Sequence, residues 1–209
     1  MEALVVHEMR EGRSPVTRDR QYDLETIVLA AGYSSRFAGN KLLQPYRDRR
    51  VIQEVVEVAR AVSTRVVVVL GHDAERVSTL IAGMAGVDRV FNHWYPLGMF
   101  TSIQRGVREV TTPRFAVLPG DLPGIDPADV HTVLEGGFAD VARPVFRGHP
   151  GHPVIMSSKL IPRILANPPA ATMQEIHRHY TVHLVEVDNP LVCADIDTQT
   201  DYHRLRERS

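Results

Sequence analysis

The sequence predicts an α/β protein in which helices cover both faces of a mainly parallel, Rossmann-like sheet, giving three layers. Short uninterrupted apolar runs alternate along the chain with stretches that carry apolar residues at helical spacing. Continuous apolar runs are typical of strands buried on both faces, and their alternation with helices builds parallel sheets. Two polar, glycine-containing loops, residues 31–41 and 119–123, each follow one of these apolar runs directly.

The elements follow in order from these patterns. The run Ile27-Val28-Leu29 and the four valines before Leu70 predict the first two strands, and Val51, Val55, Val58, Ala59 and Val62 predict the helix between them. Asp126 is a suitable cap and Pro127 a suitable first residue for a later helix. The expected strands span residues 26–30, 65–70, 88–92, 114–118, 141–146, 153–156 and 182–187. The expected helices span residues 51–62, 74–84, 99–110, 127–134, 158–166, 173–179 and 199–207.

Length and composition limit the classes of function. The 209 residues suffice for one well-cored domain, expected at 23–209 behind a flexible leader at 1–22. Lys and Arg total 24 and Asp and Glu total 25, so no overall field favours nucleic acid or an anionic membrane. The single cysteine, Cys193, excludes an intramolecular disulfide and a cysteine-based zinc site. With neither a signal peptide nor a membrane-length apolar run, a cytoplasmic location is the default expectation.

The first loop has the residue types that bind a triphosphate. Gly32 permits close backbone approach, Ser34 and Ser35 offer hydroxyl groups, and Arg36 and Lys41 supply positive charge. The loop matches neither the Walker pattern nor Gly-x-Gly-x-x-Gly. The alternative is an ordinary strand-to-helix turn with solvated cations.

Several segments in order resemble the MobA-like family of nucleotidyltransferases, in particular its molybdopterin cytidylyltransferases. The first is Leu29-Ala30-Ala31-Gly32-Tyr33-Ser34-Ser35-Arg36, with Lys41 at the spacing of the family signature. The others are Gly98-Met99-Phe100-Thr101-Ser102, Pro119-Gly120-Asp121-Leu122-Pro123, Gly151-His152-Pro153-Val154 and Asp195-Ile196-Asp197-Thr198. The resemblance spans about residues 26–203. It departs at Phe37-Ala38, where the family has Met-Gly.

The resemblance implies a fold of the nucleotide-diphospho-sugar transferase type and a role for each matching residue. The triphosphate would be held by residues 29–36, which include Ser34, Ser35 and Arg36, and by Lys41. Gly98 and Ser102 would line the nucleotide, and Gly151 and His152 would face the acceptor. Asp121 and Asp197 would bind Mg²⁺, which prefers hard oxygen ligands. For Asp121 the alternative is a turn-forming aspartate, which Pro-Gly-Asp-x-Pro favours by itself.

The implied activity is transfer of a nucleotidyl group from a nucleoside triphosphate to a phosphorylated acceptor, with release of pyrophosphate. Ala31 favours CTP, because family members that use GTP tend to have glycine there. Molybdopterin is the expected acceptor, and a molybdoenzyme or its maturation factor is an expected partner. Two alternatives remain: a nucleotidyltransferase for sugar phosphates or other small phosphates, and a nucleotide-binding maturation factor without catalysis.

Other conspicuous residues receive structural interpretations. His177 and His179 stand two apart on an expected helix and therefore point in different directions, which favours a solvated face over a metal site. Residues 92–96 are expected to pack as a loop lid near Gly98, and Trp94, the only tryptophan, is more typical of a core residue than of a ligand platform.

Overall fold

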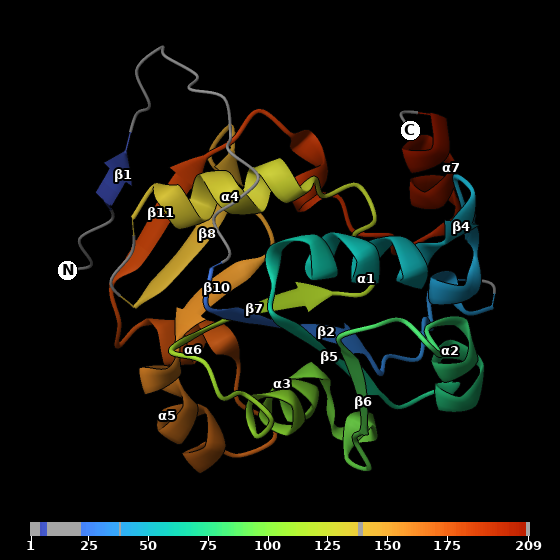
Figure 1. Cartoon of the computed structure of the whole chain (residues 1–209), viewed down its shortest axis with the longest axis horizontal. Helices are drawn as coiled ribbons and strands as arrows, with labels where there is room; N and C mark the ends of the chain where they lie inside the picture. Colours follow the sequence, from blue (N-terminus) through green and yellow to red (C-terminus); the bar gives the residue numbers. More distant parts are fainter. Residues whose placement is uncertain (1–4, 8–21, 38, 138–139, 208–209) are drawn as a thin grey trace.

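The structure, a computed structural model, describes residues 5–7, 22–37, 39–137 and 140–207. Its centre is a nine-stranded sheet in the order β1-β11-β8-β10-β7-β2-β5-β6, with β9 paired to β8 beside this path (Figure 1). The strands are β1 (Val5–His7), β2 (Leu24–Ala30), β5 (Arg65–Leu70), β6 (Val87–Phe91), β7 (Arg114–Pro119), β8 (Val141–Phe146), β9 (His149–Pro150), β10 (Val154–Ser157) and β11 (Val182–Glu186).

The expected mainly parallel sheet is confirmed. β2 lies between β5 and β7 and runs parallel to both, and β8 is parallel to β11. β10 is antiparallel to β7 and to β8, so it reverses direction within the sheet. After β2 the chain continues to β5 on one side of β2, and it later returns to β7 on the other side. The connections that follow β2 and β7 therefore leave in opposite directions, which makes the boundary between these two strands a topological switch point. Ligands bind at such a switch point, outside the carboxyl ends of the strands.

Helices cover both faces of the sheet, which gives the expected three layers (Figure 1). The helices are α1 (Val51–Val62), α2 (Ala74–Leu80), α3 (Met99–Val107), α4 (Pro127–Glu135), α5 (Ile161–Ala166), α6 (Met173–His177) and α7 (Gln199–Glu207). Residues of α1, α2, α4 and α7 share one hydrophobic core with the sheet. Residues of α3, α5 and α6 form a second core on the opposite face. Val68 and Val69, adjacent on β5, belong to different cores, as the alternation of side chains along a strand requires.

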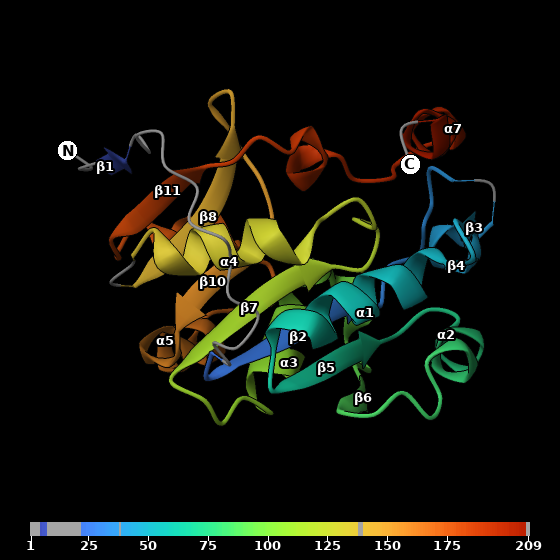
Figure 2. The same cartoon turned by 45° about the horizontal axis from the view of Figure 1, so that its top comes forward.

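The boundaries differ from expectation at several places. α2 ends at Leu80 rather than residue 84 and α3 at Val107 rather than 110, and the segment 158–160 is a 3-10 turn before α5. The hairpin β3 (Pro45–Tyr46) and β4 (Arg49–Arg50), and the strand β9, were not expected. Figure 2 shows the hairpin beside α7, at the end of the molecule opposite β1. None of the helices in the described ranges is long and apolar enough to cross a membrane.

The segment expected to be a leader contains β1, which pairs in parallel with β11. The rest of that segment, up to residue 21, lies outside the described residues. Trp94, expected in the core, is 67% exposed, because it lies in the turn between β6 and α3 rather than within either element.

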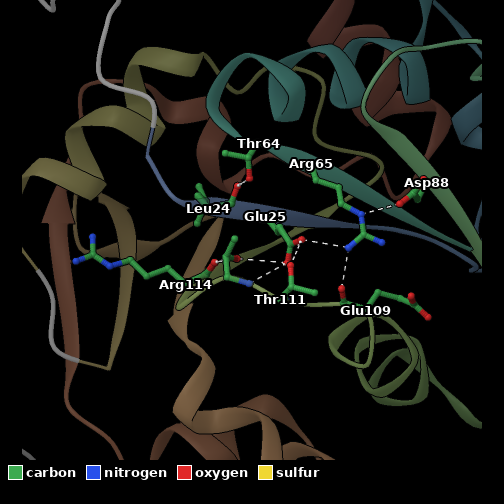
Figure 3. Close-up of polar contacts among 9 residues, drawn as sticks. Leu24, Glu25, Thr64, Arg65, Asp88, Glu109, Thr111 and Arg114 are labelled. Atoms are coloured by element: carbon green, nitrogen blue, oxygen red, sulfur yellow. Dashed lines mark hydrogen bonds and ion pairs between the residues drawn. The ribbon is translucent and has the colours of Figure 1, made fainter.

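A buried carboxylate ties together the amino ends of the central strands, away from the switch point (Figure 3). Glu25 on β2 is 2% exposed and accepts hydrogen bonds from the backbone N–H of Thr111 (2.6 Å) and from Arg65 (3.1 Å). Arg65 also contacts Asp88 on β6 (2.6 Å) and the carbonyl of Glu109 (2.8 Å). Burial would raise the pKa of Glu25, but these hydrogen bonds outweigh it, so the pKa is lowered.

We therefore expect Glu25→Gln to lower the free energy of unfolding by about 2 kcal/mol, since it removes the charge from several buried hydrogen bonds. Asp88→Asn is the matched control, because Asp88 contacts the same arginine but is 56% exposed. Its effect should stay below about 1 kcal/mol. Urea denaturation of the three proteins measures both values, and equal losses in the two variants would contradict a special role for Glu25.

Candidate nucleotide-transfer site

The loop after β2 is shaped by three backbone features. Ser34 has a positive φ of 53°, and its carbonyl accepts a hydrogen bond from the N–H of Phe37 (2.8 Å), which closes a tight turn. Asn40 caps the following 3-10 turn (Lys41–Leu43) by accepting a hydrogen bond from the N–H of Leu42 (2.9 Å). This cap fixes the position at which Lys41 leaves the backbone.

The ammonium group of Lys41 lies between two carboxylates from distant parts of the chain. Its Nζ is 2.5 Å from Oδ2 of Asp121 and 3.6 Å from Oδ1 of Asp197. Asp121 follows β7, and its carbonyl accepts a hydrogen bond from the N–H of Ile196 (3.3 Å), which brings the segment 195–197 to the switch point. The side chains of Lys41 and Asp121 are only 17% and 14% exposed, so solvent screens this pair weakly.

Arg36 reaches the same group of charges from outside. Its Nη1 is 2.8 Å from Oδ2 of Asp197, but the arginine side chain is 73% exposed. An ion pair this exposed contributes little to stability. Arg36 is therefore free to exchange Asp197 for another anion at low cost.

The carboxylates at this point suit a divalent cation. Asp121 and Asp197 both contact one cationic group, which means that their oxygens converge. Burial, and then the charges of Asp121 and Asp197, raise the pKa of Asp195, so a third carboxyl lies close by. Among the described residues, no group of three or more His, Cys, Asp or Glu side chains forms a complete metal site. A hard cation held by these aspartates would therefore need further oxygen ligands, which the phosphates of a nucleotide can supply.

A cavity of about 330 Å³ opens beside these charges, and we call it the first cavity. Eight residues expected in the site line it: Leu29, Ala31, Gly32, Ser34, Lys41, Gly98, Ser102 and Asp121. Tyr33, Leu42, Tyr95, Pro96, Met99 and Pro119 complete the lining. Of the other expected residues, Ala30, Ser35, Arg36 and Asp197 do not belong to this lining. The rings of Tyr33 and Tyr95 lie 5.2 Å apart and give the cavity an aromatic rim.

Asn92 was expected in a loop near Gly98 but not among the site residues, and it positions one wall of the first cavity. Its buried amide donates to the hydroxyl groups of Thr101 (2.9 Å) and Ser102 (3.0 Å) at the start of α3. Its Oδ1 accepts a hydrogen bond from the N–H of Trp94 (3.0 Å). The location of Asn92 just after β6 was the only available signal.

Phe37, where the chain departs from the family pattern, has a structural role. Its side chain is 5% exposed and belongs to the core beneath α1. Its ring packs edge-to-face on Tyr202 of α7, with 6.0 Å between the centroids. Ala38 lies outside the described residues, and Gly39 takes a positive φ of 95°. The aromatic residue thus anchors the loop to α7.

A larger cavity of about 970 Å³ adjoins the first one, and we call it the second cavity. Both cavities are lined by Leu29, Met99 and Pro119. His152, expected to face the acceptor, lines the second cavity, whereas Gly151 does not belong to its lining. The carbonyl of Gly151 instead accepts hydrogen bonds from Arg143 on β8.

The prediction that His177 lies on a solvated face is wrong. His177 ends α6 and lines the second cavity, and its Nε2 atom is buried without a hydrogen-bond partner among the described residues. Helical spacing predicts that the side chains of His177 and His179 point in different directions, but it does not show that α6 lies against the sheet. His179 is exposed, as expected.

The comparisons with known proteins agree with this geometry. The sequence profile of the MobA-like NTP transferase domain matches residues 26–187. The chain belongs to this family, which makes it a nucleotidyltransferase. It is 26% identical over 189 residues to the molybdenum cofactor cytidylyltransferase of Escherichia coli K12, covering 88% of this chain and 96% of that protein.

Solved structures support the same assignment. The crystal structure of Rv0371c from Mycobacterium tuberculosis H37Rv superposes with a TM-score of 0.78 at 26% identity, covering 90% of this chain and all of that one. A structure of Rv0371c with manganese superposes with a TM-score of 0.76 at 26% identity, covering 89% and 99% of the two chains.

Gly32 offers a test of the loop as a phosphate-binding element. A Cβ atom added at Gly32 would meet no heavy atom within 4 Å, and φ is not positive, so the fold itself does not require glycine there. We expect Gly32→Ala to leave the melting temperature nearly unchanged but to weaken nucleotide binding about tenfold or more, because the methyl group blocks close backbone approach. Calorimetric titration with nucleoside triphosphates measures this.

Gly120→Ala is the contrasting variant for that experiment. A Cβ atom at Gly120 would lie 2.9 Å from the carbonyl oxygen of Leu29, so this variant should lower the melting temperature. If Gly32→Ala were instead the destabilised variant, with unchanged affinity per folded molecule, the loop would have a structural role only.

The buried histidines predict an acid-sensitive fold. Burial, and then the charge of Arg143, lower the pKa values of His152 and His177 to about 4. Unfolded histidine takes up its proton near pH 6.5. The stabilisation from the neutral rings is therefore complete above pH 6.5 and is lost as the pH falls towards 4.

Between pH 6.5 and 4.5 we expect the free energy of unfolding to fall less steeply in His177→Gln than in wild type, by about 1 kcal/mol per pH unit. Urea denaturation at several pH values measures both slopes. His203→Gln, at an exposed histidine of α7, is the control and should leave the slope unchanged. Equal slopes for wild type and His177→Gln would show that His177 titrates normally in the folded protein.

Proposed function

We propose that this nucleotidyltransferase moves CMP from CTP to the terminal phosphate of molybdopterin, with Mg²⁺ as cofactor and pyrophosphate as the second product. The observation that carries this proposal is the convergence of Lys41, Asp121 and Asp197 beside the first cavity, which adjoins the second. The first cavity would hold the nucleotide and the second the acceptor. The cytidylyltransferase of Escherichia coli, similar along nearly its whole length, supports the choice of substrates.

In the reaction, a phosphate oxygen of the acceptor attacks the α-phosphorus of CTP. The bond from that phosphorus to the oxygen bridging the α- and β-phosphates breaks, and pyrophosphate leaves with the bonding electrons. The acceptor phosphate is already ionised near neutral pH, so the reaction needs no general base. Catalysis therefore depends on holding the two substrates in line and on offsetting negative charge.

The cationic side chains would offset the charge on the triphosphate. Lys41 lines the first cavity, and Arg36 forms an exposed ion pair with Asp197. The backbone of residues 31–34 would approach the phosphates on the side that Gly32 leaves open. The described contacts of Ser34 keep this loop in one conformation.

Asp121 and Asp197 would hold the magnesium ion, as hard oxygen ligands do. When bound, Mg²⁺ neutralises phosphate charge and orients the triphosphate for displacement. The manganese complex of the similar Rv0371c protein supports a divalent ion in this family.

Ala31 supports a pyrimidine base. It lines the first cavity, and its methyl group occupies volume that a glycine at this position would leave empty. This leaves less room for a purine. The rings of Tyr33, which is exposed, and Tyr95, which is half-buried, offer apolar surface to the base from the rim.

The direct test is pyrophosphate release by purified protein with Mg²⁺, each of the four nucleoside triphosphates, and molybdopterin or sugar 1-phosphates as acceptor. We expect turnover with CTP and molybdopterin. Turnover only with sugar phosphates would replace the acceptor. Tight nucleotide binding without turnover for any pair would indicate a maturation factor without catalysis.

We expect Asp121→Asn to lower kcat at least 1,000-fold while the protein stays folded, because the amide cannot replace the charge of a metal-binding carboxylate. The same pyrophosphate assay measures kcat, and circular dichroism checks folding. Asp48→Asn, in the exposed β3–β4 turn, is the control and should keep wild-type activity. Full activity of Asp121→Asn would remove the metal assignment.

A further inference from the structure

The second cavity has an uneven distribution of charge. Arg143 and Arg178 are among its lining residues, and none of the described residues that line it is acidic. Arg178 is exposed and lies at the C-terminal end of α6. Most other lining residues are apolar, including Leu29, Ile103, Val117, Val154, Met156 and Leu184. A cavity of this composition favours an anionic ligand.

Arg143 lacks the partner that a half-buried guanidinium usually has. Its Nε and Nη2 atoms donate to the carbonyl of Gly151 at 3.1 and 2.9 Å. No carboxylate of the described residues lies within ion-pair distance of it. Burial lowers its pKa, and only the Cys193 thiol counteracts this shift. Removing a charge from water without a counter-ion costs several kcal/mol, so this arginine does not serve the stability of the fold.

The neighbouring histidines leave Arg143 as the one half-buried charge among the described residues that line the second cavity. His152 and His177 line the same cavity, and their lowered pKa values keep both rings neutral at pH 7. The bonds to Gly151 hold the plane of the guanidinium, while its Nη1 group has no partner among the described residues. A fixed fork with free N–H groups is the arrangement that binds an oxyanion.

Strand register gives the distance from Arg143 to the transfer site. Val154 on β10 pairs with Val117 on β7, and Ile155 pairs with Ala142 on β8, so Arg143 lies level with Val117. It is two residues before the carboxyl end of β7 and two strands away. With about 3.3 Å per residue and 4.8 Å per strand, the Cα atom of Arg143 lies on the order of 10 Å from that end. In the proposed reaction the acceptor phosphate that attacks CTP lies near that end, so Arg143 is placed to contact another part of the acceptor.

We propose that Arg143 is a specificity-determining residue that binds a second anionic group of the acceptor, separate from the phosphate that receives the nucleotidyl group. This proposal rests on the proposed function, in which the second cavity holds the acceptor. It defines the acceptor class as molecules that carry a second anionic group besides this phosphate. Simple phosphorylated alcohols and neutral sugar phosphates lack the second group, so the enzyme discriminates against them.

The test compares Arg143→Gln and Arg143→Lys with wild type. Gln keeps a donor for the Gly151 carbonyl and removes the charge, whereas Lys keeps the charge and loses the fork. We expect Arg143→Gln to raise the KM for molybdopterin about 10- to 100-fold, as loss of a charge-assisted hydrogen bond predicts, with the KM for CTP unchanged. The KM of Arg143→Lys for molybdopterin should lie between the values of wild type and Arg143→Gln. Arg147→Gln, at an exposed arginine just after β8, is the matched control and should match wild type.

A second measurement does not require turnover. Crystals of wild type and Arg143→Gln are soaked in iodide, and the anomalous signal locates bound anions. We expect iodide beside Arg143 in wild type and none there in Arg143→Gln. The melting temperature of Arg143→Gln without ligands should equal or exceed that of wild type, because an unpaired charge has been removed.

The outcomes separate this proposal from the proposed function. Wild-type turnover with an unchanged acceptor KM in Arg143→Gln would overturn the role of Arg143 and leave the function intact. Iodide beside Arg143 in a wild-type protein that transfers no nucleotide would support the anion site and reject the function. A large fall in the melting temperature of Arg143→Gln, with no iodide bound in wild type, would assign Arg143 to holding the Gly151 segment.

Discussion

The contact of Lys41 with Asp121 and Asp197 joins three segments that are far apart in the chain. Lys41 comes from the loop after β2, Asp121 from the end of β7, and Asp197 from the segment before α7. The like charges of Asp121 and Asp197 would repel each other, and Asp195 adds a further carboxyl whose pKa is raised by burial and by its neighbours. A cationic group between them is therefore a condition for the closed site. In the proposed function the same carboxylates bind a metal ion and the same lysine binds phosphate.

The fold makes this convergence possible because β2 and β7 are adjacent and parallel, with their connections leaving in opposite directions. The polar network at the other end of the sheet complements it. Glu25 and Arg65 hold the amino ends of β2 and β5, so the strands stay in register up to the switch point. The antiparallel strand β10 separates β7 from β8, and Arg143 on β8 lines the second cavity. The two cavities adjoin, and the proposed function assigns one substrate to each.

Much of the fold could be predicted from the sequence because its signals are local. The valine run before Leu70, the helical spacing from Val51 to Val62, and Asp126 with Pro127 at the start of α4 all act within a few residues. Helix ends were less predictable. The sequence indicates no stop near residue 80, but α2 turns there to return the chain to β6. Trp94 was misplaced for a similar reason, since residue type alone does not show which turn lies outside the core.

The sequence by itself determined the alternating architecture, the family, and the candidate residues of the glycine-containing loop. Only the tertiary structure decided what those residues contact. In the folded protein Phe37 is buried against Tyr202, and Asn92 holds the start of α3. His177 lines a cavity and does not face the solvent. In the tertiary structure Arg143 is half-buried, and no carboxylate of the described residues lies within ion-pair distance of it. The physical reason is that burial and charge compensation depend on residues far apart in the chain, which no local pattern records.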